Sequence, residues 1–272
     1  MRRSSGLKMR FILGLIMAGI ALISYYGKTQ VNPLTGEKQQ VGMSPEQEVA
    51  MGLQSAPQMA QEYGGLYPDN QIQQQIKSVG KKLVNSFNAD MENKGVDNPY
   101  RFDFHVLRDS KTVNAFALPG GQIFITAGLL SRLQSEDQLA GVLGHEIGHV
   151  VHRHSAQQMA KGEFFQGLAG AATAASGSYG TAQVANYVAQ IKMMKFGRDD
   201  ELQSDEFGVR YLIHSNYQPE AMIEVMEILA EASGGDMNRD EFMSSHPSPA
   251  NRVQKIKEHM VRYSGNPSAA SF

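Results

Sequence analysis

The stretch His145-Glu146-Ile147-Gly148-His149 decides how the rest of this 272-residue chain is interpreted. Two histidines four residues apart lie on the same face of a helix, so both imidazoles can bind one zinc ion. Zinc lowers the pKa of a bound water from about 16 to about 7, and a neighbouring carboxylate can then take a proton from that water. The motif therefore predicts metallopeptidase chemistry, with His145 and His149 as metal ligands and Glu146 as the general base.

The residues around this motif predict that it lies on a mostly buried amphipathic helix. Ser135 is followed three residues later by Gln138, a pairing that caps helix N-termini. The apolar residues that follow at helical spacing are Leu139, Val142, Leu143, Ile147, Val150 and Val151. Gly144 and Gly148 each cost about 1 kcal/mol relative to alanine inside a helix, which is understandable where another backbone or a substrate approaches closely. Because an unpaired polar cluster on such a helix would be costly, a chance match is a poor explanation.

A third metal ligand is expected from a second helix, about fifty residues further along. Glu201 and Asp205 are one helical turn apart there, and Ser204 and Gly208 place small side chains on the same stripe, so that two helices can pack closely. We assign Glu201 as the third ligand of one zinc ion per chain. Asp205 is expected to orient a ligating histidine through its other ring nitrogen. The alternative is a solvated acidic helix start, because acidic residues favour a helix N-terminus in any case.

Other zinc-peptidase arrangements fit the chain less well. A metzincin would carry glycine at position 152 and histidine at 155, where this chain has His152 and Ser155. A thermolysin-like site needs a glutamate about twenty residues after the second histidine and an aspartate one turn later, and Glu163 lacks that partner. His152 and His154 are expected to be structural. His154 should point away from the ligating face, and a fourth protein ligand would close a site that catalysis needs open.

Four segments of the chain occur in a fixed order over about 140 residues. They are Asn114-Ala115-Phe116-Ala117-Leu118-Pro119-Gly120-Gly121, the zinc-binding helix, Arg198-Asp199-Asp200-Glu201 through Asp205, and His246-Pro247 followed by Arg252. Together they resemble the membrane-associated zinc endopeptidases that include the CAAX prenyl endopeptidase, the HtpX heat-shock proteases, the mitochondrial Oma-type proteases and the periplasmic BepA-like proteases. Ser204 departs from the alanine usual in this family. The resemblance implies an α+β, mainly helical, zincin-like (gluzincin) metalloprotease domain with a small β-sheet beside the active-site helix.

An extended segment containing Asn114, Ala115, Phe116 and Ala117 is the candidate substrate-binding strand. The Pro-Gly-Gly sequence at 119–121 predicts a tight turn after it, leading into a second extended segment. In zinc peptidases an edge strand beside the active helix pairs with the extended substrate backbone. We therefore expect these four residues to bind substrate, the alternative being an ordinary buried hairpin.

The resemblance also places His246 near the catalytic cleft. Neighbouring prolines hold the backbone extended, so its side chain can be aimed reproducibly. His246 is therefore a candidate catalytic residue that either stabilises the oxyanion or occupies the fourth position on zinc in a resting state. A surface histidine at a helix entry is the third interpretation.

Residues 1–27 predict a signal-anchor or a signal peptide. Basic residues precede an uncharged apolar run from Phe11 to Tyr26, and Lys28 follows it. The run is slightly short for a spanning helix and slightly long for a signal-peptide core, and we favour an uncleaved anchor with the catalytic domain on the periplasmic side. The alternatives are secretion to the periplasm and a mitochondrial presequence leading to the inner membrane.

The rest of the chain is expected to form a polar linker (28–43), one zinc metalloprotease domain (44–266) and a tail (267–272). Within the domain, Phe164 to Ser176 is rich in alanine and glycine and is either a mobile lid or a packed helix. Because the net charge is −2, we do not expect nucleic acid to be a partner. The absence of cysteine leaves histidine and carboxylate as the metal ligands.

Two functions from different classes follow from these features. The first is a membrane-anchored zinc endopeptidase that degrades damaged or misassembled membrane or envelope proteins. The second is a chaperone-like binder of unfolded envelope proteins with gated proteolysis. Protein or peptide substrates and the membrane are the expected partners, and the oligomeric state is not predicted. A lipidated-peptide substrate is excluded because one short apolar segment cannot enclose it.

Overall fold

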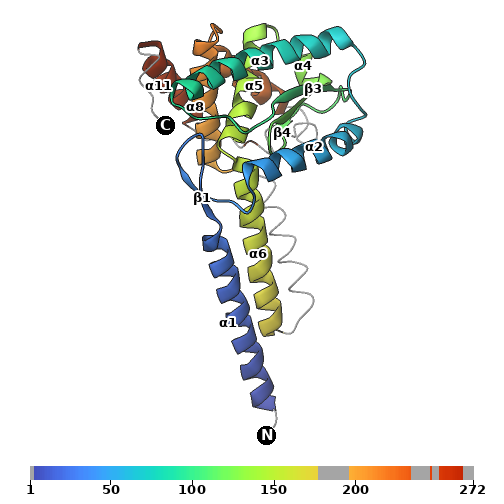
Figure 1. Cartoon of the computed structure of the whole chain (residues 1–272). Coiled ribbons are helices and arrows are strands. Elements are labelled where there is room, and N and C mark those ends of the chain that lie inside the picture. Colours follow the sequence, from blue (N-terminus) through green and yellow to red (C-terminus); the bar gives the residue numbers. More distant parts are fainter. Residues whose placement is uncertain (1–2, 177–195, 234–245, 247–250, 266–272) are drawn as a thin grey trace. The chain divides into compact units, whose positions relative to one another are not determined.

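The computed structural model describes residues 3–176, 196–233, 246 and 251–265 (Figure 1). The elements, in chain order, are α1 (Arg3–Gly27), β1 (Thr29–Val31), β2 (Lys38–Gln40), α2 (Pro45–Glu62), α3 (Asn70–Asn93), β3 (Asp103–Leu107), β4 (Ala115–Ala117), β5 (Gln122–Thr126), α4 (Ala127–Leu130), α5 (Glu136–Val151), α6 (His154–Ser176), α8 (Arg198–His214), α9 (Ala221–Ser233) and α11 (Arg252–Gly265). The predicted mainly helical α+β class is confirmed.

The chain divides into two compact units, each described here by itself. The first unit, called the catalytic unit below, consists of the described residues of 33–36, 44–155 and 196–272. The second, called the α1–α6 unit, consists of the described residues of 1–32, 37–43 and 156–195. The predicted tail (267–272) lies outside the described residues.

A three-stranded sheet in the order β3-β5-β4 forms one wall of the catalytic unit. β3 is parallel to β5, and β4 pairs with β5 in the antiparallel sense. Gly120 and Gly121 connect β4 and β5 with φ values of 80° and 111°, so the tight turn that the sequence predicts is present. Gly120 has a second role, because a Cβ there would lie 2.3 Å from the Cα of Val49 on α2.

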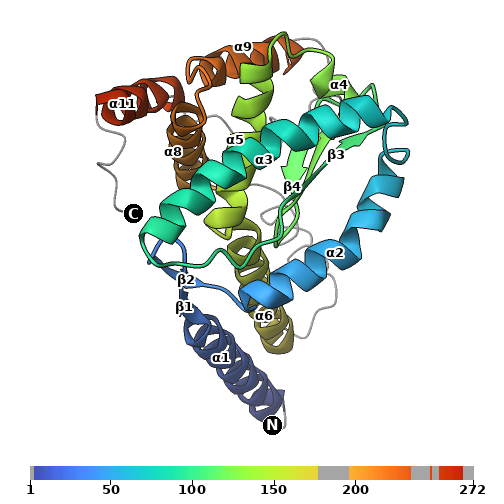
Figure 2. The ribbon, with the colours of Figure 1, turned by 45° about the horizontal axis from the view of Figure 1, so that its top comes forward.

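Helix α5 lies at the centre of the catalytic unit and contacts α3, α8, α9 and β4 (Figure 2). Its N-terminus is capped as the sequence predicts, because the Ser135 hydroxyl accepts the Gln138 amide at 3.2 Å. The predicted close helix packing is also present. A Cβ on Gly148 would lie 2.9 Å from the Cα of Ser204 on α8, so that only a glycine lets the two backbones approach this closely. This approach brings the two halves of the site together.

Two segments differ from what composition indicated. Helix α3 continues to Asn93 through a polar stretch that begins at Asn88, because Met91 extends its apolar stripe and is buried. The stretch expected to be a plain linker contains a short antiparallel hairpin of β1 and β2, with Thr29 opposite Gln40.

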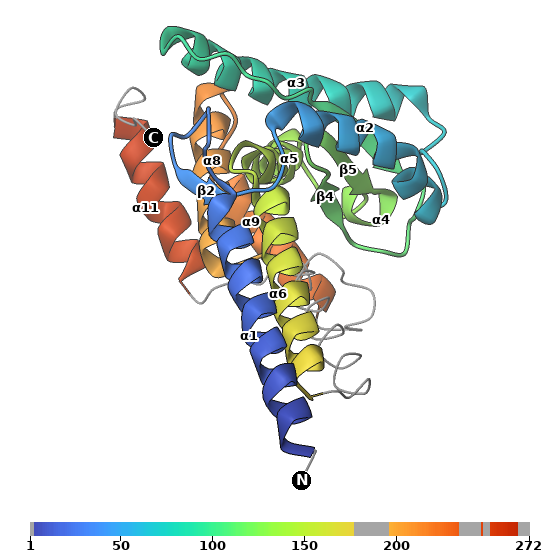
Figure 3. The same cartoon turned by 60° about the horizontal axis from the view of Figure 1, so that its bottom comes forward.

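The α1–α6 unit contains α1, this hairpin and most of α6, with the two helices running alongside each other (Figure 3). Among the described residues, one helical stretch, Lys8–Gly27 of α1, is long and apolar enough to cross a membrane. The alanine- and glycine-rich segment that ends at Ser176 is part of α6 and packs as a helix, which is one of the two alternatives predicted for it.

Candidate metal centre

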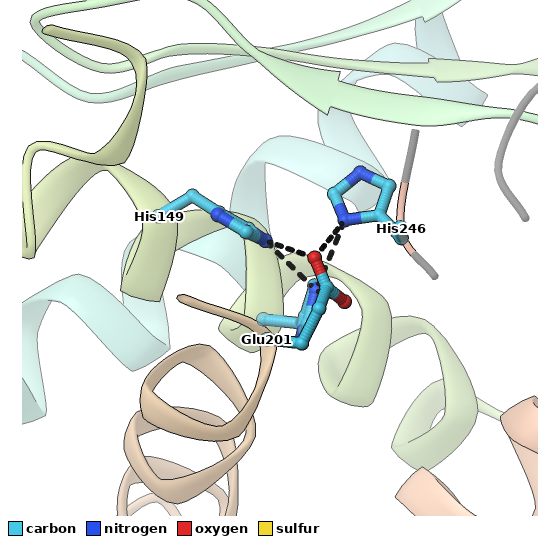
Figure 4. A group of neighbouring side chains, drawn as sticks. His149, Glu201 and His246 are labelled. Atoms are coloured by element: carbon cyan, nitrogen blue, oxygen red, sulfur yellow. Dashed lines mark hydrogen bonds and ion pairs between the residues drawn. The ribbon is translucent and has the colours of Figure 1, made fainter. Parts of the chain in front are cut away.

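Four side chains from three distant parts of the catalytic unit converge on one point. His145 and His149 come from α5, Glu201 comes from the first turn of α8, and His246 comes from the segment before α11 (Figure 4). One donor atom from each residue lies within 4.8 Å of the donor atoms of the others, and all four residues are buried. The structure therefore brings together the three predicted metal ligands and the predicted catalytic histidine.

The donor atoms have the spacing that a small tetrahedral cation needs. His145 Nε2 lies 3.0 Å from His149 Nε2 and 3.4 Å from Glu201 Oε2. His149 Nε2 lies 3.5 Å from Glu201 Oε1. Zinc bonds of about 2.0–2.1 Å in tetrahedral geometry place neighbouring donors about 3.3 Å apart. The donor set is therefore compatible with one small tetrahedral cation such as zinc.

His246 is a full member of this group. Its Nδ1 lies 3.0 Å from Glu201 Oε1 and 3.4 Å from His145 Nε2, and its side chain has no exposed surface. On its other side, Nε2 lies 3.7 Å from Glu146 Oε1. The interpretation of His246 as a surface histidine is therefore wrong.

His145 is supported on its other ring nitrogen by a charged group. Its Nδ1 lies 2.9 Å from Asp205 Oδ1, and Asp205 in turn accepts from Arg252 Nε at 2.6 Å. Arg252 also reaches Glu201 Oε2 at 3.1 Å. Burial by itself would lower the pKa of His145, but the hydrogen bonds to Asp205 and Glu201 outweigh burial and raise this pKa to about 9.

The two carboxylates are held in their charged form although they are buried. Burial raises the pKa of Glu201, but the electrostatic interaction with His246 and the hydrogen bonds from His145 and His246 outweigh burial and bring this pKa well below its usual range. Burial likewise raises the pKa of Asp205, and the charge of Arg252 more than offsets it, so this pKa is lowered. Both groups are therefore available as anions for a cation or its ligands.

His149 is supported on its other ring nitrogen by neutral groups. Its Nδ1 lies 2.9 Å from His154 Nδ1, and His154 Nε2 lies 3.0 Å from the side-chain oxygen of Gln203. Burial lowers the pKa of both histidines, so both are neutral. The consistent arrangement has His154 donating to Gln203 and accepting the Nδ1 proton of His149, which leaves the Nε2 lone pair of His149 directed at the cluster. Phe196 stacks on the His149 ring with centroids 4.1 Å apart.

The prediction that His154 points away from the ligating face is wrong, for a backbone reason. Helix α5 ends at Val151, and Arg153 adopts a left-handed conformation with φ 58° before α6 begins at His154. The turn is held by a buried ion pair in which Arg153 Nε donates to Glu48 Oε1 at 2.7 Å. Burial raises the pKa of Glu48 to about 7 against the opposing charge of Arg153.

Glu146 differs from the other acidic groups of the site. Both of its carboxylate oxygens are buried, and among the described residues neither has a hydrogen-bond partner. Burial raises the pKa of this carboxyl. A buried carboxylate without donors is costly unless a ligand or water completes it, so Glu146 is suited to accept a proton from a molecule bound in the site.

The predicted substrate strand is an edge strand that contacts α5. Ala115 is buried, whereas Phe116 and Ala117 are partly exposed, and the Phe116 ring stacks on Phe124 of β5 with centroids 5.2 Å apart. Asn114 precedes the strand, and its backbone amide donates to Thr126 Oγ1 at 3.1 Å. Substrate binding by these four residues stays a prediction.

The sequence did not identify several residues that support the centre. They are Arg252, His154, Gln203 and Phe196. Arg252 belongs to one of the four family-like segments, so its place near the site could have been inferred from that. His154 carried no such signal, since its direction depends on the unusual backbone of Arg153.

Comparisons with known proteins identify relatives of this chain. The model for peptidase family M48 matches residues 70–260, a range that contains all members of the cluster. A "Beta-barrel assembly-enhancing protease" of Yersinia pestis is 28% identical over 269 residues, covering 96% of this chain and 53% of that protein. The "Mitochondrial metalloendopeptidase OMA1" of Schizosaccharomyces pombe is 28% identical over 255 residues, covering 92% of this chain and 72% of that protein. This chain thus spans about half the length of the first relative and about three quarters of the second.

Proposed function

We propose that this chain, which belongs to peptidase family M48, is a zinc-dependent endopeptidase that hydrolyses peptide bonds of protein substrates. Family membership confirms the resemblance found in the sequence and assigns the chain to the metallopeptidases. The observation that carries the proposal is the convergence of His145, His149 and Glu201 around a buried carboxylate, Glu146, that lacks a hydrogen-bond donor in the described part of the chain.

Zinc is the cation that fits the donors best. Two imidazoles and one carboxylate at tetrahedral spacing are typical of catalytic zinc, and the chain offers no thiolate. We assign His145, His149 and Glu201 as the ligands of one ion. When bound, zinc would polarise the substrate carbonyl and lower the pKa of water at the site to about 7.

The residues of the chain then have distinct roles. Glu146 accepts the proton of the attacking water and passes it to the leaving amine. Asp205 and His154 hold the two ligating histidines in the tautomer that presents Nε2 to the ion. Residues 114–117 present an edge strand with which an extended substrate backbone can pair.

We assign His246 to the fourth ligand position in a resting state. The support is its Nδ1, which lies within 3.4 Å of both His145 Nε2 and Glu201 Oε1, as a fourth ligand would. A water or substrate oxygen needs this same position for catalysis. His246 must therefore move away before the site can act.

The substrates we propose are damaged or misassembled proteins of a membrane or envelope. The support is the names of the two relatives, one connected with β-barrel assembly and one with mitochondria. Helix α1 supplies a segment long and apolar enough to anchor the chain in a membrane. Basic residues at its N-terminal end favour an orientation with the catalytic unit on the opposite, periplasm-like side.

The decisive experiment is the Glu146→Gln variant, assayed for hydrolysis of casein and for zinc content. The amide fills the same space but cannot accept the proton, so hydrolysis should fall by about 100-fold or more while zinc content is kept. Glu258→Gln, at an exposed position on α11, is the matched control and should behave as the parent protein. Hydrolysis retained in Glu146→Gln would overturn the assignment of Glu146 as the base. Absence of chelator-sensitive hydrolysis in the parent protein would overturn the proposal and favour the chaperone-like binder.

The resting-state role of His246 is tested by His246→Ala with the same two measurements. If His246 blocks the open position, the variant should keep its zinc and hydrolyse peptide faster than the parent. A fall of about 100-fold with zinc retained would instead assign His246 to stabilisation of the transition state.

A further inference from the structure

Helices α1 and α6 pack against each other in the antiparallel sense, with their backbones nearly in contact. A Cβ on Gly14 of α1 would lie 2.8 Å from the Cβ of Ala175 and 2.9 Å from the carbonyl oxygen of Ala171. Further along, a Cβ on Gly167 of α6 would lie 3.0 Å from the Cβ of Ala21. Small residues at such a helix pair allow the close approach that is typical of helices packed in a membrane.

Where α1 ends, the helix pair carries a cluster of charged and aromatic side chains, called the rim below. Lys28, directly after α1, forms an ion pair with Glu163 of α6. One turn below, Tyr25 packs on Phe164 with ring centroids 4.8 Å apart. Tyrosines and charged side chains collect in this way at the boundary between membrane and water. The rim therefore indicates that both helices would meet the membrane–water boundary at the same position along the pair.

On the side of the rim that leads to the N-terminal end of α1, both helices have a long stretch without charged residues. Residues 11–27 of α1 and 164–176 of α6 contain no Asp, Glu, Lys or Arg. At 1.5 Å per residue, the uncharged part of α1 is about 26 Å long and that of α6 about 20 Å, compared with a hydrocarbon core of about 30 Å. If α1 crosses this core, the part of α6 packed on it reaches about two thirds of the depth.

We propose that residues 164–176 of α6 are immersed in the hydrocarbon of the lipid bilayer beside α1. The inference rests on the membrane anchoring proposed above for α1. The protein would thus meet the membrane through a pair of helices, one that spans it and one that enters it. Lipid acyl chains are the proposed partner of the outward face of α6.

The polar side chains of this segment are compatible with lipid. The Thr173 hydroxyl donates to the carbonyl oxygen of Ala169 at 2.9 Å, within the helix itself. Gln166 is exposed but lies one turn from Glu163, at the level of the interface. The many alanines and glycines contribute little transfer free energy, so α6 alone would not insert. Packing on the strongly apolar α1 is what holds it in the bilayer.

The test uses the natural absence of cysteine to place one fluorescent label at a time on the full chain. Leu15→Cys on α1, Ala172→Cys on α6 and Val261→Cys on α11 replace exposed residues and are labelled with bimane. The labelled proteins are reconstituted in vesicles whose phosphatidylcholine is brominated on its acyl chains, which quench only a probe inside the hydrocarbon. We expect comparable loss of fluorescence at positions 15 and 172 and none at 261.

The three positions separate failure of the inference from failure of the anchor. Quenching at 15 but not at 172 would overturn the immersion of α6 and leave the anchor standing. Absence of quenching at 15 would overturn both. Neither result depends on peptidase activity, which is measured separately.

A matched pair of glycine variants tests the packing argument. Gly14→Leu, combined with the probe at 172, places a side chain where Ala171 and Ala175 already lie. Gly19→Leu is the control, because a Cβ there has nothing within 4 Å. Quenching at 172 should fall in the first variant and persist in the second. Unchanged quenching in Gly14→Leu would overturn the claim that packing on α1 holds α6 in the bilayer.

Discussion

The two histidines of α5 that we propose as metal ligands are supported in different ways. His145 contacts the anionic carboxylate of Asp205, whose charge is balanced by Arg252 from α11. His149 contacts the neutral ring of His154, which is oriented by the side-chain amide of Gln203. Both contacts measure 2.9 Å and both sit in a fully buried environment.

The difference shows what each support contributes. An anion behind an imidazole makes the ligand more basic and strengthens its bond to a cation. A neutral acceptor fixes the tautomer and the ring orientation, with less effect on basicity. The contact of Asp205 with His145 should therefore mainly determine the affinity for the metal. The contact of His154 with His149 should mainly determine the orientation of the His149 ring.

The largest effect is expected from Glu201→Gln, which removes the anion that both histidines face. Zinc should be lost on dialysis, since a neutral amide is a poor ligand for this ion. Asp200→Asn is the matched control, because Asp200 caps the helix by accepting from the Gly197 amide at 2.7 Å and an asparagine oxygen can do the same. Elemental analysis after dialysis is the measurement. Equal loss of metal from both variants would show that Glu201 is not the ligand.

A smaller effect is expected from Asp205→Asn, which keeps the shape but removes the charge behind His145. Zinc affinity should fall about 10–100-fold, as for other outer-shell partners of ligating histidines. The measurement is competition with a chelator of known affinity, and Asp199→Asn, at an exposed position in the first turn of α8, serves as the control. If zinc affinity did not change, the anionic support of His145 would have no role in holding the metal.

The smallest effect is expected from His154→Ala, which removes the neutral support of His149. Zinc affinity should fall about tenfold, at the lower end of the range for such partners. His154→Asn can still accept a proton from His149 and should restore part of the loss, which a purely structural role for the ring would not explain. A drop as large as that of Asp205→Asn would remove the proposed distinction between the two supports.

Local patterns were enough to predict part of this centre. The spacing of His145 and His149 follows from helix geometry alone, and so does the one-turn spacing that selects Glu201 and Asp205. The cap at Ser135 is likewise local, because a serine and a glutamine three residues later interact within one turn. The resemblance to a known family then placed these pieces in one site.

Other features depended on contacts that no local pattern records. The extension of α3 to Asn93 follows from burial of Met91 against the core, which outweighs the polar composition of this turn. The role of His154 follows from the left-handed backbone at Arg153, which a buried ion pair with Glu48, 105 residues away, stabilises. The packing of α6 on α1 depends on two glycines meeting alanines of a helix about 150 residues away.

The sequence by itself determined the chemistry that we propose for this protein, because the proposed metal ligands and base occur at spacings that any helix converts into one face. Tertiary structure alone decided how that chemistry is supported. It selected His145 as the partner of Asp205, placed Arg252 against that aspartate and set the neutral ring of His154 against His149. The physical reason is that a side chain's neighbours within a turn are set by backbone geometry, whereas burial, charge balance and ring orientation are set by residues that only folding brings close.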